Sequence, residues 1–355
     1  MRLFRIEQLQ PGMVLAQDVI RMDGRALIMH LKPGEILDQK KILRLHSFDF
    51  DALMVEDDNY PGVHYKKYIS DELRETCRGM LQRLFLKIEK KPSSIDKNEL
   101  LAFTPIIRDM IYELRDLEKI SPIQSLKKET EYIADHALNT VLISAAVAKA
   151  MKTTIDIMEK VMFSALFYDI GMLFIPKSLY TDRKVISEHE RIDIARHTEL
   201  GFDFLSRFQL SGIGSLAAYT ALRHHERING SGYPGGRLLT APVNVVAQIC
   251  GIADHYIALI SDRPYRIAFS RHEAVRTYIQ HNDAFSRHVR DAFMASIILF
   301  PDGASVRLNA GDEAVVLNQN TDPFRPVVQS TNDGSVHDLA VERKRRIDDC
   351  FVWKK

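Results

Sequence analysis

The sequence predicts a mainly α-helical protein, in which a helical bundle is flanked by a small N-terminal β-rich module and a small C-terminal β unit. Residues 129–298 carry helical apolar patterns almost throughout, whereas Gly- and Pro-containing turns separate short apolar runs before residue 62 and after residue 300. A length of 355 residues is enough for two or three domains. We therefore divide the chain into four segments, residues 1–62, 63–124, 125–299 and 300–355.

Residues 1–62 are predicted to form a small curled sheet or partial barrel. Turn dipeptides recur about every ten residues, at Pro11-Gly12, Asp23-Gly24 and Pro33-Gly34. They bracket apolar runs of strand length at residues 13–20 and 26–31. A short helix is expected near residues 39–46, and a last strand is expected near residues 52–55.

Residues 63–124 carry two helical patterns. Apolar residues recur at steps of three and four over residues 103–114, and earlier at Ile69, Leu73, Cys77, Met80, Leu84 and Ile88. One interpretation is a helical hairpin packed on the next domain. The other is a seam that, together with the N-terminal module, holds the chain in a homodimer.

After residue 300 the pattern changes back to short apolar runs separated by turns. The runs lie at residues 305–308, 314–317 and 326–328, and they predict a small β unit. The charge run at residues 342–346, Glu-Arg-Lys-Arg-Arg, is predicted to be solvated.

Composition excludes several classes of protein. The net charge is only +1, which argues against a DNA-binding surface covering the whole protein. Three scattered cysteines, Cys77, Cys250 and Cys350, encode neither a disulfide framework nor a cysteine-type zinc site, as expected for a cytoplasmic protein. Neither a signal peptide nor a membrane-spanning segment is evident.

Five ionisable residues in the helical region recur at a regular spacing. Steps of 33, 28, 27 and 30 residues connect them, in the order His136, Asp169, His197, His224 and Asp254. In an antiparallel bundle, a helix and its return can bring each side chain to the same level, which is how bundles build two-metal centres. Imidazole with carboxylate suits iron, manganese or zinc. The alternative is an internal hydrogen-bond network of histidines and aspartates.

The segment that follows His224 adds further candidates. His225 points about 100° away from His224 if both lie on a helix, so it would serve a different coordination position. A Gly-rich stretch, residues 229–236, then includes Tyr233 and Pro234. Glycine and proline together make a rigid loop with an accessible backbone, which would hold Tyr233 over the end of the helix.

The run from His224 to Pro234, His-His-Glu-Arg-Ile-Asn-Gly-Ser-Gly-Tyr-Pro, resembles the signature of the HD-GYP family, and so does the stretch from Asp254 to Arg266. The resemblance covers residues 130–298. It implies a cytoplasmic signalling enzyme that hydrolyses cyclic di-GMP with two transition-metal ions, iron first and manganese second. Signalling proteins are further expected partners. The matching metal ligands are His136, Asp169, His197, His224, His225 and Asp254.

The same resemblance assigns roles to individual residues. Asp169 would bridge the two metals and polarise the attacking water. Arg263 and Arg266 match positions that bind substrate phosphates, for which a guanidinium is well suited. Tyr233 would contact the substrate from the loop, and Tyr168 stands next to Asp169 as a further catalytic candidate.

Three residues depart from the family pattern. Tyr168 replaces the histidine of the HD pair, and Met172 replaces a lysine that would stabilise the phosphoryl transition state. Tyr132 replaces a glutamate that helps to hold a third metal in some members, so we expect no third ion. Tyr168 is either a ligand, if a metal removes its proton, or an aromatic core residue.

These departures leave two functions in competition. The first is a working phosphodiesterase with a retained two-metal site, whose rate the altered residues would reduce. The second is an impaired enzyme that binds cyclic di-GMP or a protein partner as a receptor. A phosphohydrolase that acts on another nucleotide is a third, weaker alternative.

Overall fold

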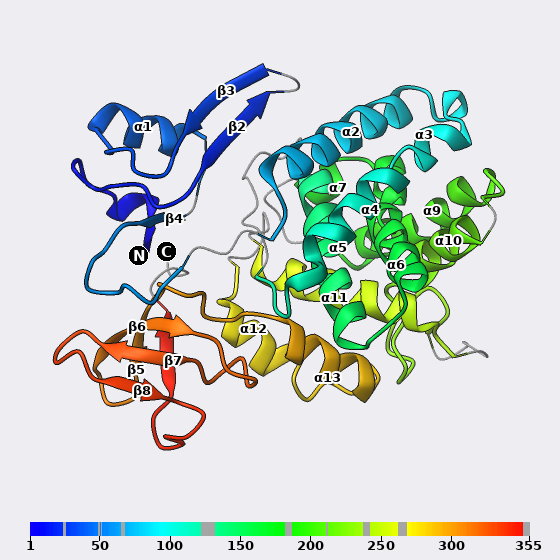
Figure 1. Cartoon of the computed structure of the whole chain (residues 1–355). Coiled ribbons are helices and arrows are strands. Elements are labelled where there is room, and N and C mark those ends of the chain that lie inside the picture. Colours follow the sequence, from blue (N-terminus) through cyan, green and yellow to red (C-terminus); the bar gives the residue numbers. More distant parts are fainter. Residues whose placement is uncertain are drawn as a thin grey trace. The chain divides into compact units, whose positions relative to one another are not determined.

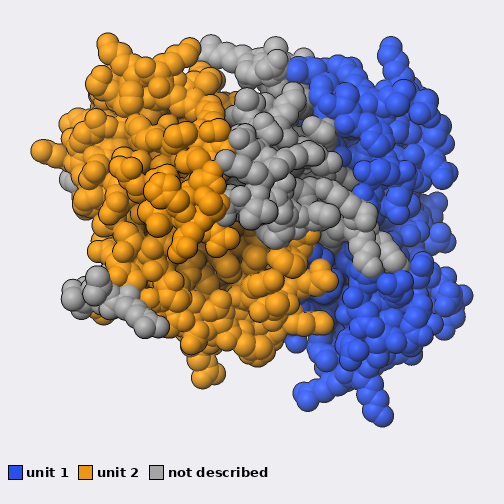
Figure 2. Space-filling model, turned by 180° about the vertical axis from the view of Figure 1, so that it is seen from behind, with its two compact units in different colours: residues 1–67, 270–272, 297–355 blue, residues 68–269, 273–296 orange. Residues whose placement is uncertain are grey.

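The computed structural model describes the chain apart from residues 24–25, 49, 51, 65–67, 122–131, 182–186, 211, 237–241, 262–267 and 351–355. Helices make up the middle of the chain and small sheets lie near both ends of the sequence (Figure 1), which confirms the predicted fold class. The chain divides into two compact units, which Figure 2 colours separately. Unit 1 comprises residues 1–67, 270–272 and 297–355, and unit 2 comprises residues 68–269 and 273–296.

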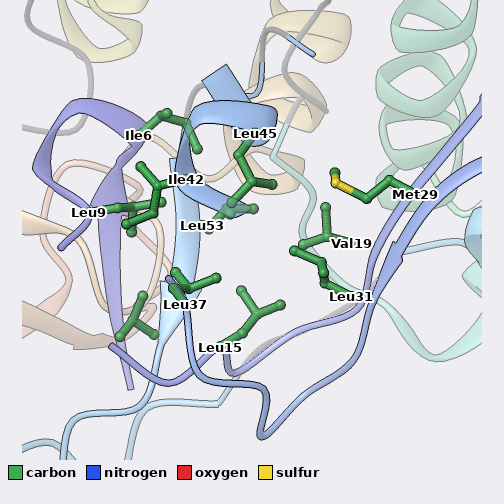
Figure 3. Packing of buried hydrophobic residues seen from close by; sticks show 11 residues of the cluster. Ile6, Leu9, Leu15, Val19, Met29, Leu31, Leu37, Ile42, Leu45 and Leu53 are labelled. Carbon is green, nitrogen blue, oxygen red and sulfur yellow. The ribbon is translucent and has the colours of Figure 1, made fainter. Parts of the chain in front are cut away.

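The N-terminal part of unit 1 contains two antiparallel strand pairs and one helix. Its elements are β1 (Arg2–Arg5), η1 (Ile6–Gln8), β2 (Val19–Asp23), β3 (Ala26–Leu31), α1 (Gln39–Ser47) and β4 (Ala52–Val55). Strand β1 pairs with β4, and β2 pairs with β3. The apolar face of α1 packs on both pairs, and Figure 3 shows Ile42 and Leu45 of that helix beside Leu53 of β4.

The expected helix and last strand of this module are present, but the apolar run at residues 13–20 is not one continuous strand. Val14 and Leu15 form only isolated bridges, and regular pairing begins at Val19. Between them the Gln17 side chain accepts a hydrogen bond from the Met54 backbone N–H at 2.9 Å. The chain therefore bends between these positions, and the module has two separate strand pairs in place of a partial barrel.

The C-terminal part of unit 1 is an antiparallel sheet of five strands in the order β8-β7-β6-β5-β9. The strands are β5 (Ser305–Leu308), β6 (Glu313–Asn318), β7 (Val327–Ser330), β8 (Val336–Asp338) and β9 (Ile347–Cys350). Apolar patterning predicted the first three and missed the last two. Strand β9 contains Asp348 and Asp349, which interrupt the pattern, and the Asp349 carboxylate is paired with Arg307 at 2.9 Å. The charge run before β9 is largely exposed, as predicted.

The two parts of unit 1 share backbone contacts and a core. The Leu3 N–H donates to the Gly303 carbonyl at 2.9 Å. Gly303 has a φ of +80° and lies against Met54 and Val63, so a side chain there would be strained and crowded. Unit 1 therefore contains residues of both the first and the last predicted segment.

Unit 2 consists of helices that surround α5 and α6 (Figure 1). Its helices are α2 (Asp71–Lys90), η2 (Pro92–Ser94), α3 (Lys97–Leu101), α4 (Thr104–Glu113), η3 (Leu114–Asp116), α5 (Tyr132–Ala150), α6 (Ile155–Phe167), η4 (Ile170–Phe174), α7 (Ser178–Thr181), α8 (Glu188–Ala195), α9 (His197–Ser206), α10 (Ile213–Arg223), α11 (Val245–Ile260), α12 (Arg271–Tyr278) and α13 (Arg287–Ser296). Helix α5 contacts α6, α11 and α13, while α10 packs on both α6 and α9. None of the described helices is long and apolar enough to span a membrane.

Helix α2 packs on α4 and α5, which favours the first of the two interpretations of its apolar seam. Of the seam residues, Ile69, Cys77, Leu84 and Ile88 are buried within the chain. A buried ion pair joins the same helices, because the Arg78 Nε donates to the Asp135 carboxylate at 2.9 Å. The homodimer remains a prediction that would need another surface.

A lysine links the end of α5 to the segment that precedes it, and this link generates a test of the packing. The Lys149 Nζ donates to the carbonyls of Leu114 at 3.0 Å and of Leu117 at 2.6 Å. We expect Lys149→Met to lower the free energy of unfolding by about 1–3 kcal/mol, because charge-assisted hydrogen bonds are lost. Lys160→Met is the matched control, since its partner Asp156 is 71% exposed, and it should change stability by less than about 0.5 kcal/mol. Equal urea midpoints for the two variants would contradict the prediction.

Candidate metal centre

Five secondary-structure elements of unit 2 deliver the predicted ligands to one place. His136 lies in the first turns of α5, and Asp169 lies between α6 and η4. His197 begins α9, His224 follows the last residue of α10, and Asp254 lies on α11. The regular spacing in the sequence thus corresponds to one residue from each element, most of them near helix ends.

Three imidazoles form the centre of this cluster. His197, His224 and His225 each offer a ring nitrogen, and these atoms lie within 4.8 Å of one another. The Nε2 atoms of His197 and His224 lie 3.3 Å apart. The Nδ1 atoms of the same rings contact backbone carbonyls, Ile194 O at 2.7 Å and Ala221 O at 2.9 Å.

These contacts determine where the protons of the two rings lie. A carbonyl oxygen only accepts, so each Nδ1 carries the hydrogen and each Nε2 presents a lone pair. Burial, together with the neighbouring His197, lowers the pKa of His224 to about 3, and burial also lowers the pKa of His197. Both rings are therefore neutral, and two lone pairs face each other at 3.3 Å. A cation between them removes that repulsion, so the residues fit a metal ion.

Asp254 and His136 lie on the side of the cluster formed by α5 and α11. The Asp254 carboxylate is buried and lies 2.9 Å from the His136 Nε2 through its Oδ1. Its Oδ2 lies 3.9 Å from the His225 Nδ1. Burial by itself raises the pKa of Asp254, but the hydrogen bond with His136 and the nearby imidazoles hold that pKa well below its usual range. The carboxylate is therefore ionised and adds negative charge to the site.

Tyr168 contacts the same carboxylate from the end of α6. Its phenol O–H donates to the Asp254 Oδ1 at 2.9 Å, lies 3.3 Å from the Thr140 hydroxyl, and is completely buried. Burial and the charges of Asp254 and Asp169 raise the pKa of Tyr168 well above its ordinary value. The residue is thus a buried side chain whose phenol donates a hydrogen bond to Asp254, and phenolate ligation would require a metal to remove that proton.

Asp169 contacts the cluster through His197. Its Oδ1 lies 3.4 Å from the His197 Nε2, and its side chain is 20% exposed. Asp169 is thus more accessible than Asp254, whose side chain is 10% exposed. A carboxylate at the accessible edge of an imidazole cluster can reach both a metal and a substrate.

Three glycines allow the histidines to approach one another, and sequence reasoning assigned a role to neither Gly171 nor Gly251. A Cβ at Gly171 would overlap the His197 carbonyl, and one at Gly251 would overlap the His224 carbonyl. A Cβ at Gly232 would overlap the His225 carbonyl. Gly251 could have been found from the sequence. A glycine inside an apolar helix lowers helix stability by about 1 kcal/mol relative to alanine, so its presence indicates a close contact at that position.

The Gly-rich loop brings Tyr233 to the histidines, as its sequence predicted. The Tyr233 ring stacks on the His225 imidazole, with centroids 4.6 Å apart and an interplanar angle of 29°. Burial and the charges of Asp254 and Asp169 raise the pKa of Tyr233, so its phenol stays neutral and can donate. Arg227, which sequence reasoning also missed, donates to the His224 carbonyl at 3.0 Å and lies over the Phe285 ring.

Some predicted positions cannot be placed. Arg263 and Arg266 lie outside the described residues, as does the side chain of Tyr132. Met172 is described and half-buried in η4, three positions after Asp169.

Sequence comparisons with known proteins cover the part of the chain that carries this cluster. The HD domain family matches residues 120–288. The cyclic di-GMP phosphodiesterase PA4108 of Pseudomonas aeruginosa is 29% identical over 207 residues, which is 58% of this chain and 49% of that protein. The cyclic di-GMP phosphodiesterase response regulator RpfG of Xanthomonas campestris is 28% identical over 229 residues, 63% of this chain and 58% of that protein.

A cyclic di-GMP phosphodiesterase of Thermotoga maritima is 29% identical over 209 residues, 59% of this chain and 55% of that protein. The chain spans about half the length of these curated relatives. The chain matches the HD domain family over residues 120–288 and is similar to cyclic di-GMP phosphodiesterases, and Tyr168 stands where the HD-GYP signature has the histidine of its HD pair.

Proposed function

We propose that the protein is a metal-dependent phosphodiesterase that hydrolyses cyclic di-GMP at a reduced rate. The observation that carries this proposal is the convergence of three imidazoles, whose pKa values burial lowers, beside two aspartates, Asp169 and Asp254. The matched relatives are named cyclic di-GMP phosphodiesterases, which supports this substrate.

The HD domain implies divalent metal binding, and we propose two ions, iron first and manganese second. The ligands would be His136, Asp169, His197, His224, His225 and Asp254. Bound metals supply an activated water and neutralise charge on the phosphodiester. The chain's own contribution is to keep the imidazoles neutral by burial and to present the Tyr233 phenol as a neutral donor. Arg263 and Arg266 are the proposed phosphate ligands.

A second candidate function is supported by Tyr168. Its O–H donates to the Asp254 Oδ1, which also contacts the His136 Nε2, so the phenol would compete with a metal for that oxygen. Together with Met172 in place of a lysine, this favours a catalytically impaired protein that binds metal and cyclic di-GMP and signals to a protein partner. Substrate binding is common to both candidates, whereas turnover separates them.

The metal site can be tested by removing one ligand. We expect purified wild-type protein to hold about two transition-metal ions per chain, the number typical of two-metal phosphoester sites, and Asp169→Ala to lose most of that metal. The variant should also melt at a lower temperature, because metal binding contributes to the free energy of folding. Asp156→Ala, an exposed aspartate on α6, is the matched control and should keep its metal. Elemental analysis and thermal melts measure both effects, and full metal content in Asp169→Ala would contradict the assignment.

Turnover can be tested by restoring the family residues. Tyr168→His supplies a neutral imidazole, and Met172→Lys supplies a positive charge for the phosphate. One preorganised charge stabiliser is worth about 10²–10³ in rate, so the double variant should hydrolyse cyclic di-GMP faster by about that factor.

The assay is conversion of cyclic di-GMP to linear dinucleotide or GMP, with iron or manganese supplied under reducing conditions. A metal-loaded double variant no faster than wild type would refute this account of the two departures. Tight binding of cyclic di-GMP without hydrolysis by either protein would instead support the receptor function.

A further inference from the structure

Glu226 follows the two histidines directly, and its carboxylate is completely buried. An ionised carboxylate in such a place is costly unless strong donors surround it. Three donors do so here. The Arg223 Nη1 donates to Oε1 at 3.0 Å, the Gly236 N–H donates to Oε2 at 3.0 Å, and the Gly235 N–H makes a short hydrogen bond with Oε1.

The two backbone donors lie at the far end of the Gly-rich loop, nine and ten residues after Glu226. The carboxylate therefore closes residues 226–236 into a ring, with the start and the end of the loop held at one side chain. Gly236 has a φ of +53°, a conformation that other residues rarely adopt, at the position where its N–H meets the carboxylate.

Tyr233 lies inside this closed segment and has its own contact with the histidine pair. Its N–H donates to the His225 carbonyl at 3.3 Å, and Gly232 packs against the same carbonyl. These contacts attach Gly232 and Tyr233 to the histidine pair. The Glu226 carboxylate instead binds Gly235 and Gly236, which follow Tyr233 in the loop. The stacking of the Tyr233 ring on His225 thus depends on both ends of the loop being held.

We propose that Glu226 is a positioning residue that holds the Tyr233 phenol beside the histidine cluster, where it contacts the phosphate or base of the bound cyclic dinucleotide. This proposal rests on the proposed function for the identity of the ligand. The Glu226 carboxylate is engaged by Arg223 and by the Gly235 and Gly236 amides, so its loss should weaken nucleotide binding while metal content is retained.

The first test is hydrogen exchange, which needs no activity. In wild-type protein, the Gly235 and Gly236 amides should exchange slowly, because a buried carboxylate accepts from both. Glu226→Gln keeps the shape of the side chain but removes its charge, and it should speed their exchange by about tenfold or more. Fast exchange in wild-type protein, or unchanged exchange in Glu226→Gln, would overturn the proposal. Fast exchange of these two amides in wild-type protein would contradict the proposal even if the variant does not fold.

The second test is a double-mutant cycle on binding of cyclic di-GMP. Glu226→Gln should raise the dissociation constant about tenfold with unchanged metal content, the scale of one hydrogen bond to a charged group. In a Tyr233→Ala background the same change should have almost no further effect, because Glu226 acts through Tyr233. Additive effects would assign Glu226 a purely structural role and overturn the proposal. If wild-type protein does not bind cyclic di-GMP, the proposed function fails, while hydrogen exchange still decides the role of Glu226.

Discussion

Two imidazole nitrogens that both carry lone pairs face each other at 3.3 Å in unit 2. Backbone carbonyls determine this arrangement, because each accepts the single N–H hydrogen of a neutral imidazole, at Nδ1 of His197 and of His224. Burial prevents a second proton from relieving the repulsion. A cation between the two nitrogens would remove that repulsion, and the carboxylates of Asp169 and Asp254 lie close enough to share in binding it.

Such close approach requires helices without side chains at the contact points. Gly171, Gly232 and Gly251 each lie against the carbonyl of one of the three histidines. A methyl group at any of these positions would push the corresponding imidazole away from its neighbours. The glycines thus belong to the metal centre as much as the ligands do, although they carry no chemistry of their own.

Tyr168 packs against a predicted ligand and also donates a hydrogen bond to Asp254. Its ring lies edge-on to His224, with centroids 4.7 Å apart, so it fills space next to a predicted ligand. Its hydroxyl gives Asp254 a neutral hydrogen-bond donor, and His136 contacts the same oxygen. The Asp254 Oδ1 therefore has two protein partners besides any metal. This competition is the physical basis for weighing slow catalysis against a receptor function.

The sequence alone determined the helical fold class, the small β units and the residues of the candidate centre. Periodicity and spacing carry this information, because helix faces and bundle returns repeat at fixed intervals. Patterning missed β9, since Asp348 and Asp349 become acceptable in a strand only when partners such as Arg307 are in place. Likewise, only the tertiary structure assigned the Tyr168 hydroxyl to Asp254 and the Glu226 carboxylate to the end of its loop. Such contacts join residues from separate elements, and their partners depend on distances that no local pattern in the chain encodes.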